Sequence, residues 1–275
     1  MRDRLPRNID IIAKIAEGGS SHVFKGYIKD NGLLPKRKVF AIKALKTELL
    51  KSLPFIQSLE TEYLIGRNNA LEGLVRCYEF QSTEQYSLLV MDFIEGKPVN
   101  ALFDERASMR FDQKIKLIYS LCETLKQIHS LGIIHGDIKP SNVIVLRNWK
   151  TKLIDFGLAS APNRPSVDVY YAFSTLYSSP QKIMGLKSTY ADDVYSFGAL
   201  TFRILFGCHP FAGRSSLDAL RSNLAPAEID KDQKDEIYAL INSCISFDAS
   251  RRPRSAIEVY ARLNALLNSN SSLHG

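Results

Sequence analysis

The sequence predicts an α+β fold in which a small β-rich part precedes a larger helical part. In the first part, short runs of β-branched and aromatic residues alternate with glycine-rich or polar breaks, as strands do. After Gly96 the apolar runs lengthen and take helical spacing. We therefore expect two lobes, the first over residues 1–95 and the second over residues 96–267.

The first lobe is expected to hold strands and a single helix. Strands are predicted over residues 9–16, 22–29, 38–44, 77–81 and 86–91. Helical spacing predicts the helix over residues 54–67. A hinge to the second lobe is expected at residues 92–96.

The second lobe is expected to be mainly helical. A long buried helix is predicted over residues 111–131, followed by two short apolar runs at residues 143–146 and 152–154. The apolar stretch 194–208 is interrupted by Arg203 and is too short for a membrane span, so it predicts a buried helix. Residues 268–275 lose their apolar content, and we expect a frayed tail.

Composition favours a cytoplasmic globular protein. The chain is 45% hydrophobic and 24% charged, and its first residues lack the apolar core of a signal peptide. The net charge of +7 comes without a long basic run, so we expect no nucleic-acid partner. The spacing of the cysteines fits neither a zinc site nor a disulfide framework, and they are Cys77, Cys122, Cys208 and Cys244.

A glycine-rich turn joins the first two predicted strands, in the segment IAEGGSSHVFKG. Glycines such as Gly18 and Gly19 let backbone N–H groups approach phosphate oxygens without a Cβ in the way. By itself, an ordinary turn explains this segment better than a phosphate site does.

Lys43 lies in an apolar strand, in the segment VFAIKAL. An ammonium group there needs an anionic partner, so Lys43 is a candidate to bridge ATP phosphates and a helix carboxylate. Glu62 is our choice for that carboxylate, with Glu60 as the alternative. A solvent-facing lysine on an edge strand is the simpler interpretation of the strand alone.

Two polar loops follow buried apolar runs. In IIHGDIKPSNVIV, Asp137 is a candidate to accept the proton of an attacking hydroxyl, Lys139 to neutralise the transferring phosphoryl group, and Asn142 to ligate Mg²⁺. In KLIDFGLA, Asp155 ends a short strand and is a second candidate Mg²⁺ ligand. Surface turns are the alternative for each loop taken singly.

Taken in order, these motifs resemble those of the eukaryotic-type protein kinase family, from about residue 9 to residue 267. FAIK resembles its strand lysine motif, HGDIKPSN its catalytic loop and DFG its metal loop. YSSPQK resembles the segment that usually ends in Ala-Pro-Glu, and Asp193 matches the residue that steadies the catalytic loop. Arg252 matches the arginine that pairs with the glutamate of Ala-Pro-Glu.

The resemblance implies a bilobal protein-kinase fold, ATP and Mg²⁺ as cofactors, and a protein substrate. It makes Asp137, Lys139, Lys43 and Glu62 catalytic, and Asn142 and Asp155 metal ligands. The residues implied at the nucleotide are Ile15, Gly18, Gly19, Val23, Ala41, Lys43, Met91, Asp92 and Ile94.

The resemblance also implies serine or threonine as the acceptor. Lys139 matches serine/threonine kinases, whereas tyrosine kinases place an arginine in this loop. The stretch STLYSSP resembles the serine/threonine docking loop, with Ser174 or Thr175 expected beside Asp137 and Lys139.

Several positions depart from the family pattern. Ala16 and Ser21 replace glycines, and Ser179 and Gln181 replace the alanine and glutamate of Ala-Pro-Glu. Gln181 is expected still to form a hydrogen bond with Arg252, without full charge.

Gly136 replaces the arginine that usually precedes the catalytic aspartate, which makes the chain a non-RD type. Without that cation, we expect activity to be independent of phosphorylation of residues 158–175. Packing through Val167, Val169, Phe173 and Leu176, or a partner, would order this segment instead. The alternative is that Lys182 or Arg164 takes over a phosphate.

Two other functions remain open on the sequence. A small-molecule kinase of the aminoglycoside or choline kinase type is favoured by His-Gly-Asp, and is opposed by Lys139, Asp193 and the Ser-Pro-Gln segment. A pseudokinase would be expected to lack one of Lys43, Asp137, Asn142 or Asp155, and all of them are present.

Overall fold

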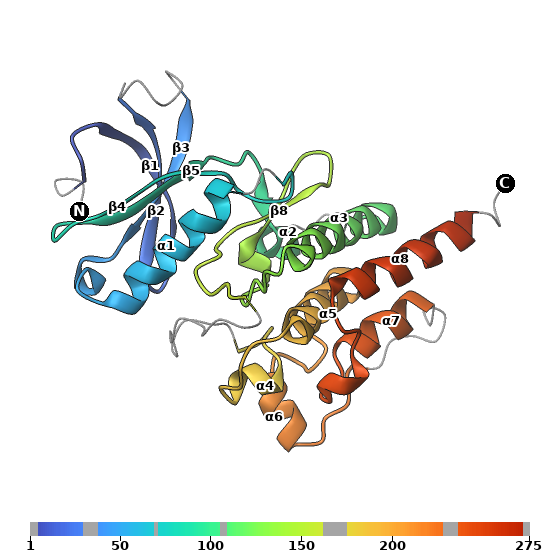
Figure 1. The fold of residues 1–275 in the computed structure, drawn as a ribbon. Coiled ribbons are helices and arrows are strands. Elements are labelled where there is room, and N and C mark those ends of the chain that lie inside the picture. Colours follow the sequence, from blue (N-terminus) through green and yellow to red (C-terminus); the bar gives the residue numbers. More distant parts are fainter. Residues whose placement is uncertain are drawn as a thin grey trace. The chain divides into compact units, whose positions relative to one another are not determined.

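The computed structural model describes residues 5–29, 38–68, 71–104, 109–161, 175–227 and 236–271. These residues form two compact units, each of which is described by itself. The first unit holds the described residues up to Glu95 together with Asp155–Leu158, and the second holds Gly96–Ile154 and the described residues from Ala159 onward. The first is built on a sheet and the second is mainly helical (Figure 1).

The first unit is a five-stranded antiparallel sheet with the strand order β1-β2-β3-β5-β4. Helix α1 packs against β4 and β5 and lies along the sheet in Figure 1. Each predicted strand and the predicted helix are present, with bounds within one residue of those expected. The elements are β1 (Ile9–Glu17), β2 (Ser21–Ile28), β3 (Val39–Leu45), a 3-10 turn (Thr47–Leu49), α1 (Leu53–Asn68), β4 (Cys77–Ser82) and β5 (Ser87–Asp92).

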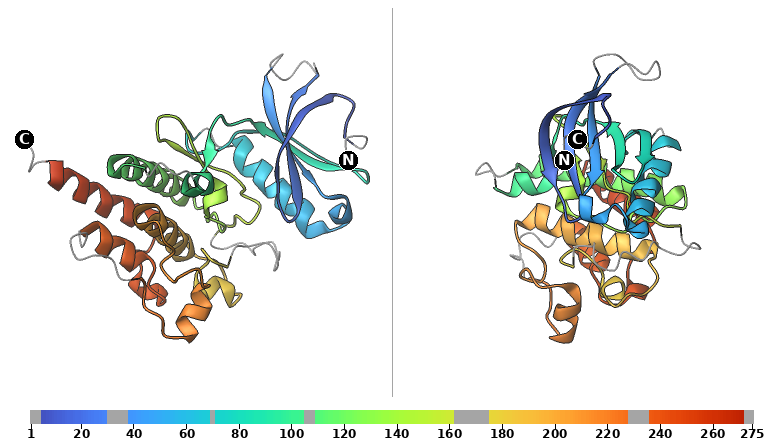
Figure 2. Two further views of the ribbon diagram at one scale, coloured as in Figure 1. Left: turned by 180° about the vertical axis from the view of Figure 1, so that it is seen from behind. Right: turned by 90° about the vertical axis from the view of Figure 1, so that its left-hand side faces the viewer.

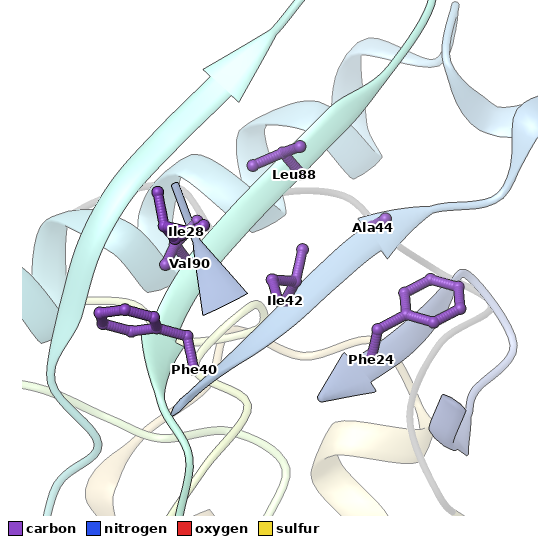
Figure 3. Packing of buried hydrophobic residues seen from close by; sticks show 7 residues of the cluster. All are labelled: Phe24, Ile28, Phe40, Ile42, Ala44, Leu88 and Val90. Atoms are coloured by element: carbon purple, nitrogen blue, oxygen red, sulfur yellow. The ribbon is translucent and has the colours of Figure 1, made fainter. Parts of the chain in front are cut away.

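Strand β3 separates the core of this unit from a second face of the sheet. Phe40, Ile42 and Ala44 alternate along β3 and are buried in the core. The other members of this cluster are Phe24, Ile28, Leu88 and Val90 (Figure 3). Because side chains alternate along a strand, Ala41 and Lys43 lie on the opposite face. The apolar periodicity of β3 therefore fixes the side of the sheet on which its lysine lies.

The second unit contains the remaining elements. These are β6 (Lys97–Pro98), α2 (Val99–Asp104), α3 (Phe111–Ser130), a 3-10 turn (Pro140–Asn142), β7 (Val143–Val145), β8 (Thr151–Leu153), α4 (Pro180–Ile183), α5 (Tyr190–Phe206), α6 (Ser216–Arg221), α7 (Glu236–Cys244), a 3-10 turn (Ala249–Arg251) and α8 (Ala256–Ser271). The three short strands pair in the order β6-β7-β8. Along the ranges that the structure describes, no helix is both long and apolar enough to cross a bilayer.

Helix α5 is the centre of this unit and is buried along most of its length. It packs against α3, α7 and α8, and α3 in turn lies alongside α8 (Figure 2). The helix begins four residues before the expected start at residue 194, because Thr189 and Asp192 form a capping box that satisfies its first N–H groups. It ends at Phe206 and is followed by the capping residue Gly207, whose φ of +75° is favourable for glycine.

The first turn of α5 carries Asp193, whose carboxylate is 1% exposed. Its Oδ1 accepts a hydrogen bond from the Gly136 N–H at 2.8 Å, and its Oδ2 accepts one from the His135 N–H at 2.7 Å. The expectation that Asp193 steadies this loop is thereby confirmed. His129 Nε2 lies 3.0 Å from Oδ2. Because His129 Nδ1 accepts the Ala256 N–H, its Nε2 carries the hydrogen and donates it to Asp193.

Burial alone would raise the pKa of Asp193, but the hydrogen bond from His129, together with the nearby histidines and the Gly136 N–H, holds the pKa below its ordinary value. A carboxylate with a lowered pKa in the folded state stabilises the fold above its unfolded pKa of about 3.9, and this contribution is lost as the pH falls through the folded pKa.

We therefore expect Asp193→Asn to lower the free energy of unfolding of the second unit by about 2–3 kcal/mol at neutral pH, because it removes hydrogen bonds to a charged acceptor. The difference from the wild type should stay constant between pH 5 and pH 8, and shrink below about pH 4. Urea unfolding at a series of pH values measures it. Asp112→Asn, which changes an exposed carboxylate, is the control and should have little effect. Equal losses in both variants would contradict the prediction.

Candidate active site

Lys43 lies between two carboxylates of the first unit. Its Nζ is 2.7 Å from Glu62 Oε2 and 2.9 Å from Asp155 Oδ1. Glu62 is buried on the inner side of α1, whereas Glu60 is exposed, so Glu62 is the carboxylate that Lys43 meets. We call Lys43, Glu62 and Asp155 the Lys43 cluster.

The ammonium of Lys43 contacts both carboxylates of the cluster, so each charge affects the pKa of the others. Burial would lower the pKa of Lys43, but Asp155 and Glu62 outweigh burial and hold this pKa well above its ordinary value. Burial raises the pKa of Glu62, against the attraction of Lys43. One ammonium and two carboxylates leave a net charge of −1 when all are ionised. The cluster can therefore accept a further cation.

Asp155 and Gly157 are held against α1. Ser58 Oγ donates a hydrogen bond to the Gly157 carbonyl oxygen at 2.9 Å, and a Cβ added to Gly157 would lie 2.3 Å from that hydroxyl. Asp155 has a φ of +66°, a left-handed conformation that an aspartate adopts at a local cost. The close approach explains the glycine, and together the contacts fix where the Asp155 carboxylate lies.

The side chains predicted to contact adenine share the sheet face of Lys43. In the strand register Val23 lies opposite Lys43, and Met91 lies opposite Ala41. Directly opposed residues of neighbouring strands lie on the same face. Ile15 falls at an irregularity of β1 and is 45% exposed. The face therefore offers apolar surface beside the ammonium.

The glycine-rich turn and the predicted hinge show fewer features specific to a nucleotide site than the Lys43 cluster does. The Gly18 N–H donates to the Ser21 carbonyl at 2.8 Å, whereas no atom lies within 4 Å of a Cβ added at Gly19. The Asp92 N–H already donates to the Arg76 carbonyl at 2.9 Å. Ile94 is partly buried. A hinge contact to adenine would thus use backbone groups other than this N–H.

In the second unit, Asp137, Lys139 and Asn142 form a second group, which we call the Asp137 cluster. Lys139 Nζ lies 2.6 Å from Asp137 Oδ2, and Asn142 Nδ2 lies 3.0 Å from the same oxygen. Asn142 Nδ2 also donates to the Asp137 carbonyl at 2.9 Å. Within the described ranges, neither of these donors reaches Asp137 Oδ1. The cluster therefore restrains one oxygen of the Asp137 carboxylate through two donors.

The backbone that carries Asp137 is fixed by its neighbours. The Asp137 N–H donates to His135 Nδ1 at 3.2 Å, so His135 carries its hydrogen on Nε2 and donates it to the Ile154 carbonyl, also at 3.2 Å. The Ile154 N–H donates to the Asn142 carbonyl at 3.0 Å, directly before Asp155 in the chain. Lys182 Nζ donates to the Gly136 carbonyl. The sequence predicts Lys182 only as an alternative phosphate partner, whereas the structure shows this hydrogen bond to a backbone carbonyl.

The chain after residue 174 is held by hydrogen bonds to α5, to α6 and to the loop between them. Arg203 donates to the Tyr177 hydroxyl at 2.9 Å, and Ser216 donates to the Ser178 carbonyl at 2.6 Å. His209 Nδ1 accepts the Phe211 N–H, so its Nε2 donates to the Leu176 carbonyl at 2.8 Å. The other residues predicted to matter here lie outside the described residues, and they are Arg164, Val167, Val169, Phe173 and Ser174.

Gln181 accepts a hydrogen bond from Arg252 at 2.6 Å, which confirms the expected pair. Arg252 also donates to the carbonyls of Ser246 at 2.7 Å and Ala191 at 3.0 Å. Its guanidinium therefore keeps several partners although the usual carboxylate is an amide here.

The comparisons with known proteins agree with this geometry. The chain is 29% identical over 272 residues to serine/threonine-protein kinase pkn2 of Myxococcus xanthus, an alignment that covers 93% of the chain and 32% of that protein. It is 23% identical over 269 residues to a probable serine/threonine-protein kinase of Clostridium perfringens, covering 95% of the chain and 38% of that protein. It is 29% identical over 209 residues to a probable serine/threonine-protein kinase, PknB, of Lactococcus lactis, covering 75% and 33%.

The chain thus spans between about a third and two fifths of the length of these relatives. A family model described as protein kinase domain matches residues 9–262, which include both clusters. The chain therefore belongs to the protein kinase domain family.

Proposed function

We propose that this chain is a serine/threonine protein kinase domain that transfers the γ-phosphoryl group of ATP to a hydroxyl of a protein. The observation that carries the proposal is the Asp137 cluster, in which Lys139 and Asn142 both restrain one oxygen of a buried carboxylate. The printed names of the relatives support the acceptor class.

The Asp137 cluster suits proton and charge management during phosphoryl transfer. Asp137 Oδ1 would accept the hydrogen of the attacking hydroxyl and orient its oxygen. Lys139, already 2.6 Å from Oδ2, would offset the negative charge of the transferring group. Little covalent chemistry is required of the protein, so the fixed positions of these groups supply most of the catalysis.

The Lys43 cluster suits the phosphates of ATP. Lys43 would contact phosphate oxygens while Glu62 holds its ammonium in place. The apolar face formed by Val23, Ala41 and Met91 would pack against adenine, with Ile15 at its edge. Backbone groups at Asp92 and Ile94 would bind the adenine edge, and Gly18 and Gly19 would cover the phosphates.

We propose Asn142 and Asp155 as ligands of Mg²⁺. Across the described part of the chain no three His, Cys, Asp or Glu side chains gather into a metal site. Mg²⁺ commonly keeps several waters and binds through one or two protein oxygens plus substrate phosphates, so an amide and a carboxylate fit it. When bound, Mg²⁺ neutralises phosphate charge. Asn142 is oriented for this by Asp137, which takes both hydrogen bonds from its Nδ2.

Two observations bear on the surroundings of the reaction. The four cysteines are free thiols, which suits a reducing compartment such as the cytoplasm.

The stretch Leu176–Ser178 is held by hydrogen bonds from Arg203, His209 and Ser216. We propose it as part of the protein-substrate docking loop, with the exposed Thr175 next to it.

We expect Lys43→Ala, Asp137→Ala and Asp155→Ala each to lower kcat by at least about a hundredfold, because each removes a charge aimed at ATP, the hydroxyl or Mg²⁺. The measurement is transfer of labelled phosphate from ATP to casein, with circular dichroism to verify the fold. Glu60→Ala is the matched control, since this exposed carboxylate lies on the same helix as Glu62 and should leave kcat unchanged.

Turnover in Asp137→Ala equal to that of the wild type would refute the assignment. Equal, background transfer in the wild type and in Asp155→Ala would instead favour a pseudokinase. Transfer to an aminoglycoside or to choline but not to casein would favour a small-molecule kinase.

We expect the phosphorylated product to contain phosphoserine or phosphothreonine, because Lys139 lies beside Asp137 as serine/threonine kinases require. Phosphoamino-acid analysis of the labelled casein measures this, with Asp155→Ala as the blank. Label found only in phosphotyrosine would refute the acceptor class.

We also expect activity to be independent of phosphorylation of residues 158–175, since Gly136 offers no cation to a phosphate and Leu176–Ser178 is anchored by hydrogen bonds from Arg203, His209 and Ser216. Phosphatase treatment should change kcat by less than about tenfold, or ~1.4 kcal/mol of barrier. The second arm changes Ser160, Ser166, Ser174 and Thr175 to alanine together. Ser174 and Thr175 are also changed singly, because either is a candidate to contact the catalytic loop. A larger loss after phosphatase treatment alone would show dependence.

A further inference from the structure

The peptide unit between Gly136 and Asp137 is held at both of its polar groups. Its N–H, which belongs to Asp137, donates to His135 Nδ1 at 3.2 Å. Its carbonyl, which belongs to Gly136, accepts from the Lys182 ammonium. Since the orientation of this peptide plane sets the direction of the Asp137 side chain, both contacts bear on where that carboxylate points.

The glycine at residue 136 makes the backbone conformationally flexible at this position. Gly136 has a φ of +80°, and without a Cβ its backbone has other conformations at similar energy. Asp193 fixes the Gly136 N–H at 2.8 Å, but that group belongs to the preceding peptide unit. Among the hydrogen bonds described above, those with His135 and Lys182 are the ones that restrain the peptide unit directly before Asp137. Of these, Lys182 alone supplies a charged donor.

Helix α4 places the ammonium of Lys182 where it can reach this carbonyl. Ser179 caps the helix by accepting the Lys182 N–H at 3.1 Å, and the Ser179 hydroxyl donates to Asp192. The position of Lys182 is thus tied to the first turn of α5. Burial lowers the pKa of the Lys182 ammonium below its ordinary value, although the nearby carboxylates of Asp193, Asp137 and Asp192 favour its charged form.

We propose that Lys182 is a positioning residue for phosphoryl transfer: it holds the Gly136 carbonyl and thereby the orientation of Asp137, in place of a side chain at residue 136. The proposal rests on the proposed function, because it assigns Lys182 a role in that reaction. Lys182 also connects the stretch Leu176–Ser178, which leads into α4, with the loop that carries Asp137. The contact requires no modification of the chain.

The test compares Lys182→Met, which keeps the length of the side chain and removes its charge and donor, with Lys182→Arg, which keeps both. Lys187→Met is the matched control, since Lys187 is exposed in the same segment. Transfer of labelled phosphate to casein is measured for each variant and for the wild type, at a temperature at which circular dichroism shows all of them folded. If Lys182→Met does not fold, Lys182→Gln, which retains a neutral donor, takes its place.

We expect Lys182→Met to lower kcat by at least about tenfold with the KM for ATP within twofold, because a small displacement of a reacting group is costly while nucleotide binding is untouched. Lys182→Arg should recover most of the loss, Lys182→Gln should be intermediate, and Lys187→Met should match the wild type. Hydrogen exchange of peptides covering residues 134–142 should be faster in Lys182→Met, with residues 194–206 unchanged.

A kcat of Lys182→Met, or of Lys182→Gln where it is used, within twofold of Lys187→Met would overturn the proposal, as would a rise in the KM for ATP that accounts for the whole loss. An inactive wild type would instead refute the proposed function. The two failures are therefore distinguishable.

Discussion

A buried charge without partners costs more free energy than a marginally stable fold can supply. In the second unit the buried Asp193 carboxylate is such a charge, so it requires hydrogen-bond donors around it. Three donors satisfy it: the N–H groups of His135 and Gly136 and the ring of His129. His129 in turn accepts the first N–H of α8. One carboxylate thus connects α3, α5 and α8 with the loop that carries Asp137. The hydrogen bonds from the N–H groups of His135 and Gly136 to the Asp193 carboxylate therefore fix the conformation of the loop that carries Asp137.

In the first unit the buried charge that needs partners is a cation, and its partners are carboxylates. There the group that needs partners is the Lys43 ammonium, and Glu62 and Asp155 supply them from α1 and from the segment that returns to this unit. The pairing explains why a glutamate is tolerated at 1% exposure in the middle of α1. It also leaves the cluster one positive charge short of neutrality, which suits a site for a cation and phosphates.

Gly136 shows how a lost side chain can be offset by the backbone. Residue 136 carries no side chain and therefore no cation, and the flexible glycine would by itself loosen the neighbouring peptide. The Lys182 ammonium from α4 binds the carbonyl of that same glycine. A lysine distant in sequence thus returns a positive charge to the loop, and it does so through a backbone atom rather than through a phosphate.

The sequence alone determined the two-part order of strands and helices, because apolar periodicity distinguishes a strand from a helix without any knowledge of tertiary contacts. It also determined the candidate groups of the Asp137 cluster, since these lie within six residues of each other. It left Glu60 and Glu62 open, because both are acidic residues of one helix and only the packing of α1 on the sheet buries one of them. The role of Lys182 as a partner of Gly136 was decided by tertiary structure alone. The two residues are 46 positions apart, and a hydrogen bond to a backbone carbonyl leaves no signature in the identity of the residue that accepts it.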